Sequence, residues 1–313
     1  MSEYQYYEFQ TVDRPLEETD RQALRAISTR ARITATSFTN SYEWGDLKGD
    51  PADFMKRWFD LHLYLANWGT RRFMIRFPKR LVDQRFLKPL LLGIDWATLQ
   101  AAGDTLILDI ARDEVELDED WDDGSGWLAA LAPLRADILA GDLRLFYLLW
   151  LGAVESDGLG DDEIEPMAGI GPLTGALGAF AEFFGIDPDL VEAAVDHPVT
   201  ATATSPDAAG KVITGMTDRE KTDLLTRLFD GDPHIAAELR ALVRKRLGKH
   251  DAGLSRGTRT AGELRSRARA IRLARDHVTA EKAAVERRRQ AEEAEKARLA
   301  RIEAMTRRGE SVW

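Results

Sequence analysis

Aromatic and β-branched residues, partly alternating with polar ones, fill four stretches of the first 110 residues, and this pattern is typical of β-strands. In the third stretch, Phe73, Ile75 and Phe77 lie on one face of the predicted strand, and Arg72, Met74 and Arg76 lie on the other. The predicted strands are residues 4–12, 33–44, 72–77 and 105–110.

Two stretches between these strands carry apolar residues three or four positions apart, which predicts helices over residues 16–30 and 51–67. The second helix would begin with Asp50 as its N-cap and Pro51 at its first helical position. Its apolar face would consist of Phe54, Trp58, Leu61 and Leu65. The element order β-α-β-α-β-β therefore predicts a small mixed sheet backed by two helices.

The rest of the chain has a helical pattern. Helices are predicted over residues 127–139, 143–154, 173–184, 188–195, 217–229 and 233–247. Thr217 and Glu220 have the spacing of a capping box at the start of the fifth of these helices. Residues 260–308 contain no proline and a single glycine, Gly262, so they are predicted to form one long helix. The expected fold class is α+β: a small mixed sheet with helices at the N-terminus, an all-helical middle and a long C-terminal helix.

Acidic and linker-like stretches divide the chain into predicted domains. Residues 113–123 (DEVELDEDWDD) and 155–166 (ESDGLGDDEIEP) are rich in acids, and residues 197–210 have the composition of a linker. The predicted division is an α+β domain with two closing helices over residues 1–155, a helical domain over residues 166–249, and a long charged helical arm over residues 258–309.

The predicted long helix carries one apolar row. Leu264, Ile271, Val278 and Val285 recur every seven residues. The positions three and four residues further on are mostly Arg, Lys, Glu and Ala, whereas a stable two-stranded coiled coil needs a second apolar row. The pattern therefore favours a weakly packed or solvent-exposed helix over an autonomous coiled coil.

Charge is distributed unevenly along the sequence. The net charge of −10 combines +3 over residues 1–92, −24 over residues 93–239 and +11 over residues 240–313. Such segregation indicates interaction surfaces, between parts of this chain or with a partner. A protein with an acidic surface is the partner expected for the basic C-terminal region.

The chain has no cysteine, which excludes disulfides, thiol nucleophiles and cysteine-bound metal centres. Its first residues, MSEYQYYEFQ, lack the basic and apolar regions of a signal peptide. The longest apolar run, residues 145–154, is about half as long as a membrane span requires. These features predict a cytoplasmic protein without a membrane partner.

Motifs for metals and cofactors fail on inspection. A calcium loop starting at Asp118 would need Gly at its sixth position and Glu at its twelfth, which are Asp123 and Ala129. The glycine-rich stretch around residues 169–178 has Thr174 where a dinucleotide fingerprint needs its third glycine. The five histidines are scattered, and no P-loop motif occurs. No metal site, catalytic residue or cofactor is expected.

A basic stretch over residues 68–81 raises the question of nucleic-acid binding. Its cations are Arg71, Arg72, Arg76, Lys79 and Arg80. Basic and aromatic residues together could contact phosphates and stack on bases. However, the interleaved aromatic residues have the spacing of a core face, and the following acidic region would repel a polyanion. The favoured interpretation is a sheet strand with a charged outer face that meets residues 113–123 or an acidic partner.

The predicted C-terminal helix permits the same two interpretations, because Arg287, Arg288 and Arg289 are adjacent while glutamates lie at helical spacings around them. An enzymatic site is a further hypothesis, based on polar and aromatic residues near one another in the sequence. These residues are Trp44, Asp46, His62, Asn67, Trp68 and Arg71.

Residues 36–51 (TSFTNSYEWGDLKGDP), 58–81 and 126–151 resemble a family of uncharacterised bacterial cytoplasmic proteins without an assigned activity. The resemblance covers roughly the first half of the chain and implies a bacterial cytoplasmic protein. It provides no catalytic residue.

Three functions are therefore expected, in this order. The first is a non-enzymatic interaction or scaffold protein of a cytoplasmic assembly that docks through a basic C-terminal helix. The second is a nucleic-acid-associated protein that uses residues 71–80 and the C-terminal arm. The third is an enzyme with an unrecognised site around residues 44–71.

Overall fold

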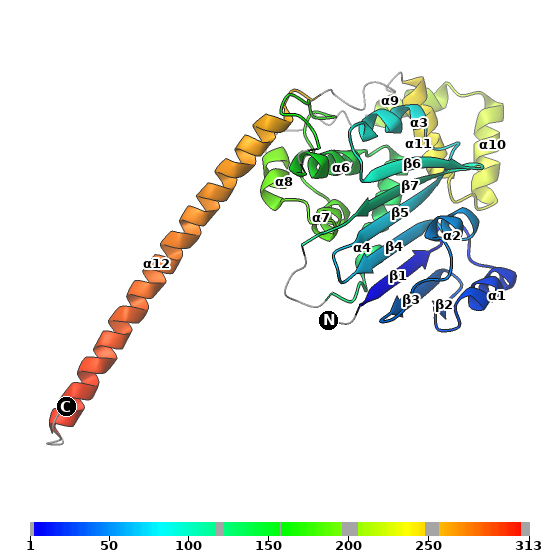
Figure 1. The fold of residues 1–313 in the computed structure, drawn as a ribbon. Helices are drawn as coiled ribbons and strands as arrows, with labels where there is room; N and C mark the ends of the chain where they lie inside the picture. The colour runs from blue at the N-terminus through cyan, green and yellow to red at the C-terminus, as the bar shows by residue number, and fades with distance from the viewer. Residues whose placement is uncertain (1–2, 117–121, 157, 196–205, 248–256, 308–313) are drawn as a thin grey trace. The chain divides into compact units, whose positions relative to one another are not determined.

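A computed structural model gives the fold of the chain (Figure 1). It describes residues 3–116, 122–156, 158–195, 206–247 and 257–307. Residues 117–121 of the first predicted acidic loop, residues 197–205 of the predicted linker and residues 308–309 of the predicted arm lie outside the described residues.

A seven-stranded sheet forms the centre of the N-terminal half, and every pair of neighbouring strands is antiparallel. Its spatial order is β2-β3-β1-β4-β5-β7-β6. The strands are β1 Gln5–Gln10, β2 Arg32–Ile33, β3 Ser37–Tyr42, β4 Leu61–Ala66, β5 Arg71–Pro78, β6 Ala97–Ala102 and β7 Thr105–Arg112. Together with the helices that follow, this sheet confirms the α+β class.

Helices account for most of the remaining described residues. Their bounds are α1 Glu18–Ile27, α2 Pro51–Arg57, α3 Gln84–Leu87, the 3-10 helix η1 Lys88–Leu91, α4 Trp127–Leu131, α5 Pro133–Ala140, α6 Arg144–Glu155, α7 Gly175–Phe183, α8 Pro188–Val195, α9 Pro206–Thr214, α10 Asp218–Phe229, α11 Ile235–Arg246 and α12 Ala261–Arg307. The capping box of Thr217 and Glu220 is present at the start of α10, and α10 packs against α11, so these two consecutive helices form a helical hairpin.

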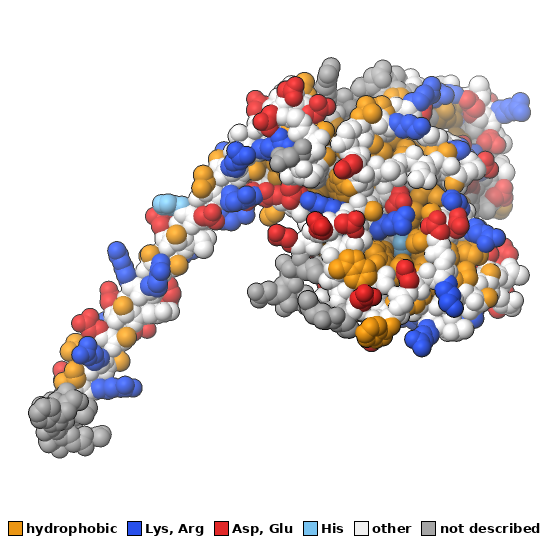
Figure 2. All heavy atoms as spheres, viewed as in Figure 1, with side chains coloured by type: hydrophobic (Ala, Val, Ile, Leu, Met, Phe, Trp, Pro, Cys, Tyr) orange, Lys and Arg blue, Asp and Glu red, His pale blue; other side chains and the backbone are white. Residues whose placement is uncertain are grey.

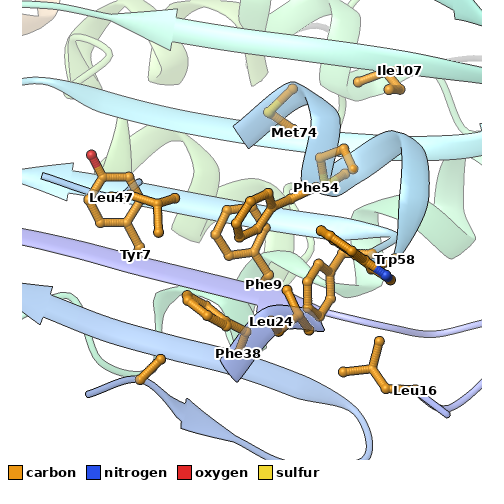
Figure 3. Packing of buried hydrophobic residues seen from close by; sticks show 13 residues of the cluster. Tyr7, Phe9, Leu16, Leu24, Phe38, Leu47, Phe54, Trp58, Met74 and Ile107 are labelled. Atoms are coloured by element: carbon orange, nitrogen blue, oxygen red, sulfur yellow. The ribbon is translucent and has the colours of Figure 1, made fainter. Parts of the chain in front are cut away.

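Both faces of the sheet are covered by helices. On the near face in Figure 1, α1 and α2 pack on an aromatic core. Figure 3 shows this core, in which Phe9 and Phe38 of the sheet meet Phe54 of α2. On the other face, α4 contacts β4, and α5 contacts β5. The fully buried leucines and aromatic residues of that face include Leu63 and Phe73, which are paired across β4 and β5.

The predicted helix over residues 51–67 is wrong in its second half. Asp50 caps α2 as expected, since its side chain accepts a hydrogen bond from the Ala52 N–H at 2.8 Å, but the helix ends at Arg57. Residues 61–66 form β4, the central strand, which is buried on both faces. The leucines of this strand, at positions 61, 63 and 65, alternate with period two, and two of them also fit the helical spacing of four. Residues 61–66 adopt the extended conformation because they are buried between two neighbouring strands.

Strand β5 alternates as predicted, with Phe73, Ile75 and Phe77 fully buried. Its other face is not an outer surface, however. Met74 is 1% exposed and belongs to the core beneath α1 and α2. The charged side chains on either side of it lie at the rim of this second core, so the predicted charged outer face is corrected to a helix-covered face with arginines at its rim.

Two further differences concern elements that carry weak patterns. Strand β6 was not predicted, because half of Ala97–Ala102 is alanine, only Thr98 is β-branched, and the strand lies at the edge of the sheet. The predicted helix over residues 127–139 is two short helices, α4 and α5, that meet at Pro133. Proline lacks an N–H group and therefore favours the start of a new helix at this position.

The chain separates into two compact units, residues 1–265 and 266–313. Helix α12, 47 residues long, begins in the first unit and continues through the second. The three-part division into residues 1–155, 166–249 and 258–309 stays a prediction. Within the described ranges, no helix is both long enough and apolar enough to span a membrane.

Candidate docking site

The segment that leads into α12 is held by backbone pairing to an acidic loop far away in the sequence. Thr260 forms a β-bridge with Ile164. The N–H of Glu165 donates to the carbonyl of Arg259 at 2.9 Å, and the N–H of Ala261 donates to the carbonyl of Glu163 at 2.8 Å. We call residues 257–265 the anchor segment. It pairs with residues 155–166, the loop whose composition predicted a domain boundary.

A buried ion pair reinforces this backbone pairing. The Glu165 carboxylate, whose residue is 2% exposed, accepts hydrogen bonds from Arg259 Nε at 3.1 Å and Nη2 at 2.9 Å, and from the Tyr147 hydroxyl. Its other oxygen accepts from the N–H groups of Thr258 and Arg259, each at 3.2 Å. Arg259 also donates to the carbonyl of Ala193 at 2.9 Å. A buried charge with this many partners is stable, because hydrogen bonds within the protein replace those it would make with water.

The ionisation of this cluster follows from the same contacts. Burial by itself would raise the pKa of Glu165, but hydrogen bonds from Arg259 and Tyr147 hold that pKa below its usual value. Burial and the adjacent Glu165 carboxylate raise the pKa of Tyr147. The cluster therefore consists of a carboxylate, a guanidinium and a neutral phenol near neutral pH.

Two glycines allow the anchor segment to lie this close to the loop. A Cβ at Gly257 would lie 1.9 Å from Cγ of Glu165 and 2.5 Å from its carbonyl oxygen, so no other residue fits without displacement. A Cβ at Gly262 would lie 3.0 Å from Cβ of Asp161. The backbone approach at residue 257 requires glycine for packing reasons.

The first turn of α12 completes the attachment. Thr260 and Glu263 form reciprocal hydrogen bonds, Glu263 N–H to the Thr260 hydroxyl at 3.2 Å and Thr260 N–H to the Glu263 carboxylate at 2.8 Å. Arg265 donates to the carbonyls of Val154 at 2.8 Å and Leu159 at 2.9 Å, and pairs with Asp161. The start of α12 is thus fixed by a cap and by an arginine clamp within the first unit.

Beyond the anchor segment, α12 combines one apolar row with one basic row. Val278 and Val285, in the row that starts at Leu264, are 47% and 67% exposed. The positions four residues after Ile271, Val278 and Val285 are all basic, and so is the next position at this spacing, 296. We call these the basic row: Arg275, Lys282, Arg289 and Lys296. Since residues seven apart share a helix face, the two rows lie side by side along α12.

The three adjacent arginines of α12 point in different directions around the helix, as neighbouring helical residues must. Arg289 pairs with Glu286 at 3.1 Å and Glu293 at 3.6 Å, and Arg287 donates to the carbonyl of Ala283 at 3.2 Å. Arg288 is exposed. Figure 2 shows side chains of both charge signs along the length of this helix. Only Arg289 of the three belongs to the basic row.

The arginines of strand β5 are engaged inside the first unit. Arg72 donates to both carboxylate oxygens of Asp109, at 2.8 and 2.7 Å. Arg76 donates to Asp60 at 2.7 and 3.1 Å. Burial would raise the pKa of Asp60, but this arginine and the N–H groups of Val12 and Asp13 have the larger effect and lower that pKa. These pairs leave little charge for a nucleic-acid backbone.

The other cations of the basic stretch also have partners. Arg71 is 6% exposed, lies 3.7 Å from Asp122 and places its guanidinium 5.4 Å from the centre of the Phe183 ring. The same stretch meets the acidic residues 113–123 at two further points: the Thr70 hydroxyl donates to Asp113 at 2.7 Å, and the Val115 N–H donates to the carbonyl of Gly69 at 3.1 Å. Arg80 pairs with Glu238 at 3.0 Å, and Lys79 donates to the carbonyl of Gly103.

Several residues of the enzymatic hypothesis gather at one end of the sheet. Strands β3 and β4 end there, since Gln5 of β1 is paired with both Tyr42 and Ala66. Trp44 and Trp68 are 78% and 47% exposed in the adjoining loops, and Asn67 accepts a hydrogen bond from the Tyr4 N–H at 3.0 Å.

These residues do not share one face of the sheet. Asp46 accepts a hydrogen bond from Tyr7, on the face covered by α2, whereas Arg71 lies on the opposite face with Phe73. Carboxylate and guanidinium are therefore separated by the sheet itself. The arrangement does not bring these two groups to one substrate.

His62 lies in the core on strand β4, and not in the helix predicted over residues 51–67. It is fully buried, its ring stacks on Phe9 with a centroid distance of 4.0 Å, and its Nδ1 lies 3.0 Å from the carbonyl of Glu8. Its Nε2 has no hydrogen-bond partner among the described residues. Burial lowers the pKa of His62 to about 3, so the imidazole is neutral at neutral pH and inaccessible to a substrate.

The residues that the sequence did not indicate are Tyr147, Glu165 and Arg259. Glu165 and Arg259 are 94 positions apart, and each lies in a stretch with several other charges. Among the described residues, no group of three or more histidine and acidic side chains is arranged to hold a metal ion. No protein-family model, no curated protein and no solved structure matches this chain.

Proposed function

We propose that this chain is a non-enzymatic interaction protein that binds an acidic, amphipathic helix of another protein along α12. The observation that carries the proposal is the apolar row of α12 with the basic row beside it, on a helix whose start is fixed by the anchor segment. A partner helix that places leucines on Val278 and Val285 and glutamates beside Lys282 and Lys296 would satisfy both rows.

The charge of α12 supports an acidic partner. Residues 266–307 contain 12 Lys and Arg against 7 Asp and Glu. The glutamates at positions 286 and 293 pair with Arg289 within the helix, but exposed pairs of this kind contribute little and can be exchanged for contacts with a partner. Charged side chains beside an apolar row set the choice and orientation of a partner helix.

A second copy of this chain is a poorer partner in a parallel pair of helices. The positions three residues after the apolar row would face their equals across the pair. These positions include Glu281 and Arg288, so like charges would be brought together along the seam. A helix with acidic residues beside a complete apolar stripe avoids this repulsion.

The anchor segment supports docking as the role of the helix. A buried carboxylate with five hydrogen bonds, two glycines in close contact and a capped first turn are more than a connection between two parts requires. Such an attachment fixes the conformation of the first turn of α12, so that less conformational entropy is lost there when a partner binds. The nucleic-acid alternative is weakened because Arg72, Arg76 and Arg80 are paired with acids.

The test is a titration of the full chain with a synthetic helical peptide of about five heptads, with Leu in its apolar rows and Glu beside them. Binding should weaken as ionic strength rises. Replacing Val278 and Val285 by Ser should weaken binding by roughly 30-fold, since each lost apolar contact is worth about 1 kcal/mol. Circular dichroism of the variants checks that α12 remains helical.

A matched pair of charge reversals separates specific docking from general attraction. Lys282→Glu with Lys296→Glu changes the basic row, and Arg287→Glu with Arg298→Glu makes the same change of charge on roughly the opposite face. The first pair should abolish binding, and the second should weaken it by less than about three-fold. Equal losses from both pairs, or self-association through Val278 and Val285 at micromolar concentration, would contradict the proposal.

A further inference from the structure

A pocket of about 780 Å³ lies in the first unit between residues 79–88 and helix α11, with the turn between α5 and α6 as its third side. This volume falls within the range of small-molecule sites in proteins, roughly 300–1,000 Å³. None of its lining residues belongs to the second unit or to the anchor segment. The pocket is therefore independent of the docking function proposed for α12.

The floor of the pocket is apolar. Leu81, Val82, Leu87 and Ile138 line it and are each less than a tenth exposed. Leu242 of α11 adds a half-buried apolar side chain to the wall. A ligand with a hydrocarbon or aromatic body would remove this surface from water.

The rim of the pocket carries an excess of positive charge. Its five cations are Lys79, Arg80, Arg85, Lys88 and Lys245, against the two carboxylates of Asp83 and Glu238. Several converging cations raise the local concentration of anions and stabilise a bound negative charge.

Both carboxylates of the pocket are already neutralised by arginines. Arg85 pairs with Asp83 at 2.7 Å, and Arg227 and Arg80 pair with Glu238 at 2.6 and 3.0 Å. Hydrogen bonds from Arg227 hold the pKa of Glu238 below its usual value. The carboxylates therefore do not cancel the charge of the three lysines.

The three lysines have no carboxylate partner in the part of the chain that the structure describes. Lys79 donates to the carbonyl of Gly103. Lys88 and Lys245 are exposed and form no ion pair with any described carboxylate. Three ammonium groups around one apolar floor are a receptor for a molecule with an anionic head and an apolar body.

We propose that this pocket binds a small amphipathic organic anion, whose carboxylate or phosphate head lies among Lys79, Lys88 and Lys245 and whose apolar body covers Leu81, Leu87 and Leu242. A free inorganic anion would leave the apolar floor in water, and an uncharged apolar molecule would leave the lysines without a counter-charge. Each of these two ligands would therefore match only one feature of the pocket, either its lysines or its apolar floor.

The test is calorimetric titration of the full chain with decanoate and decyl phosphate below their micelle-forming concentrations. Both should bind with one molecule per chain. Decyltrimethylammonium, which has the same body and the opposite charge, and inorganic phosphate, which has no body, should give no saturable heat. Equal binding of decanoate and decyl phosphate would mean that the pocket recognises any anionic head group. A strong preference would identify carboxylate or phosphate as the head group of its ligand.

Variants locate the binding. Lys245→Gln should weaken decanoate binding by roughly five-fold, and the double variant with Lys88→Gln by roughly 25-fold, as expected for about 1 kcal/mol per charge contact. Lys56→Gln, on α2 and outside the pocket, is the matched control and should leave affinity unchanged. These lysines are exposed, so the variants should unfold at the wild-type temperature.

Three outcomes would overturn the proposal. The cationic analogue could bind as well as decanoate, the double lysine variant could bind decanoate with wild-type affinity, or neither anion could bind up to millimolar concentration. Saturable binding of an acidic peptide in preference to both anions would likewise reject a small-molecule site and identify a peptide groove.

Discussion

The carboxylate of Glu165 accepts a hydrogen bond from the guanidinium of Arg259 at 2.9 Å, although the two residues are 94 positions apart in the sequence. The side chain of Glu165 is 1% exposed. Removing one partner of such a pair leaves the other charge uncompensated in a buried position. We therefore expect Glu165→Gln to lower the free energy of unfolding by about 3 kcal/mol. Urea unfolding measures this, and hydrogen exchange of the amides from Ala261 to Leu264 should accelerate.

Glu293→Gln is the matched control for this change, because Glu293 is 67% exposed and pairs with Arg289 at 3.6 Å on the surface of α12. Its effect should stay within about 0.5 kcal/mol. If both variants unfold at the same urea concentration, the buried pair does not hold the anchor segment.

Gly257 provides a steric test of the same attachment. In Gly257→Ala the new methyl group would overlap Glu165, whose Cγ lies 1.9 Å from the ideal Cβ position. The anchor segment should move away from the loop, with lower stability and faster exchange at the start of α12. Thermal unfolding followed by tryptophan fluorescence, together with exchange measurements, checks both effects.

Gly178→Ala provides the comparison, since this glycine lies inside α7 and nothing lies within 4 Å of its ideal Cβ position. Alanine has the higher helix propensity, so stability should rise by about 0.5–1 kcal/mol. A neutral result for Gly257→Ala beside a stabilising one for Gly178→Ala would show that the close contact at residue 257 has no energetic weight.

His62 should make stability depend on pH. Its pKa is about 3 in the folded chain, because burial disfavours the imidazolium, and about 6.5 in an unfolded chain. Between these values the unfolded chain binds a proton that the folded chain excludes, so stability falls as the pH decreases from about 6.5 towards 3. From pH 7 to pH 4.5 the loss should be about 2–3 kcal/mol.

His62→Gln should lack this contribution. The difference in unfolding free energy between wild type and variant is measured in urea at pH 7 and at pH 4.5, so that other titrating groups cancel. The difference should shift in favour of the variant at the lower pH. A difference that is independent of pH would mean that His62 is protonated to the same extent in both states.

Arg76 distinguishes a structural arginine from a nucleic-acid contact. Arg76→Gln leaves the Asp60 carboxylate, 1% exposed, without its principal counter-charge and should cost about 3 kcal/mol of stability at neutral pH. Because the pKa of Asp60 is lowered in the folded chain, this contribution is present above the usual aspartate pKa of about 4 and is lost at lower pH.

Arg85→Gln, at a side chain that is 87% exposed, should change stability by less than about 0.5 kcal/mol. A gel-shift assay with double-stranded DNA at low salt completes the comparison. Stable Arg76→Gln protein with reduced DNA binding would support the nucleic-acid alternative and contradict the structural role.

Local patterns predicted strands β1, β3, β5 and β7 and most of the longer helices, because the signals of these elements are contained in a few consecutive residues. The alternation of Phe73, Ile75 and Phe77 and the box of Thr217 and Glu220 are of this kind. Strand β4 was missed because its leucines satisfy two periods at once. Only the neighbouring strands β1 and β5, which bury it on both sides, decide between them.

The helix of the candidate site could be predicted from the sequence, but its attachment to the first unit could not. The apolar row of α12 follows from four apolar residues, Leu264 to Val285, that recur every seven positions. The pairing of Glu165 with Arg259 depends on the folded backbone, which selects one acid and one base from 53 and 43 in the chain. Three of the five cations of the basic stretch, Arg71, Arg72 and Arg76, lie in strand β5. Arg71 lies beside Asp122 of the acidic segment that was expected to match them, but Asp109 and Asp60, the partners of Arg72 and Arg76, lie outside that segment.

Strand β2, at one edge of the sheet, consists of only Arg32–Ile33. An outer strand is a template on which another chain can add its own strand, and repeated addition leads to fibres. Two residues, one of them a cation, give too short a ladder for such growth to start. The outermost strand at this end therefore protects a seven-stranded sheet from polymerisation, and lengthening it would remove that protection.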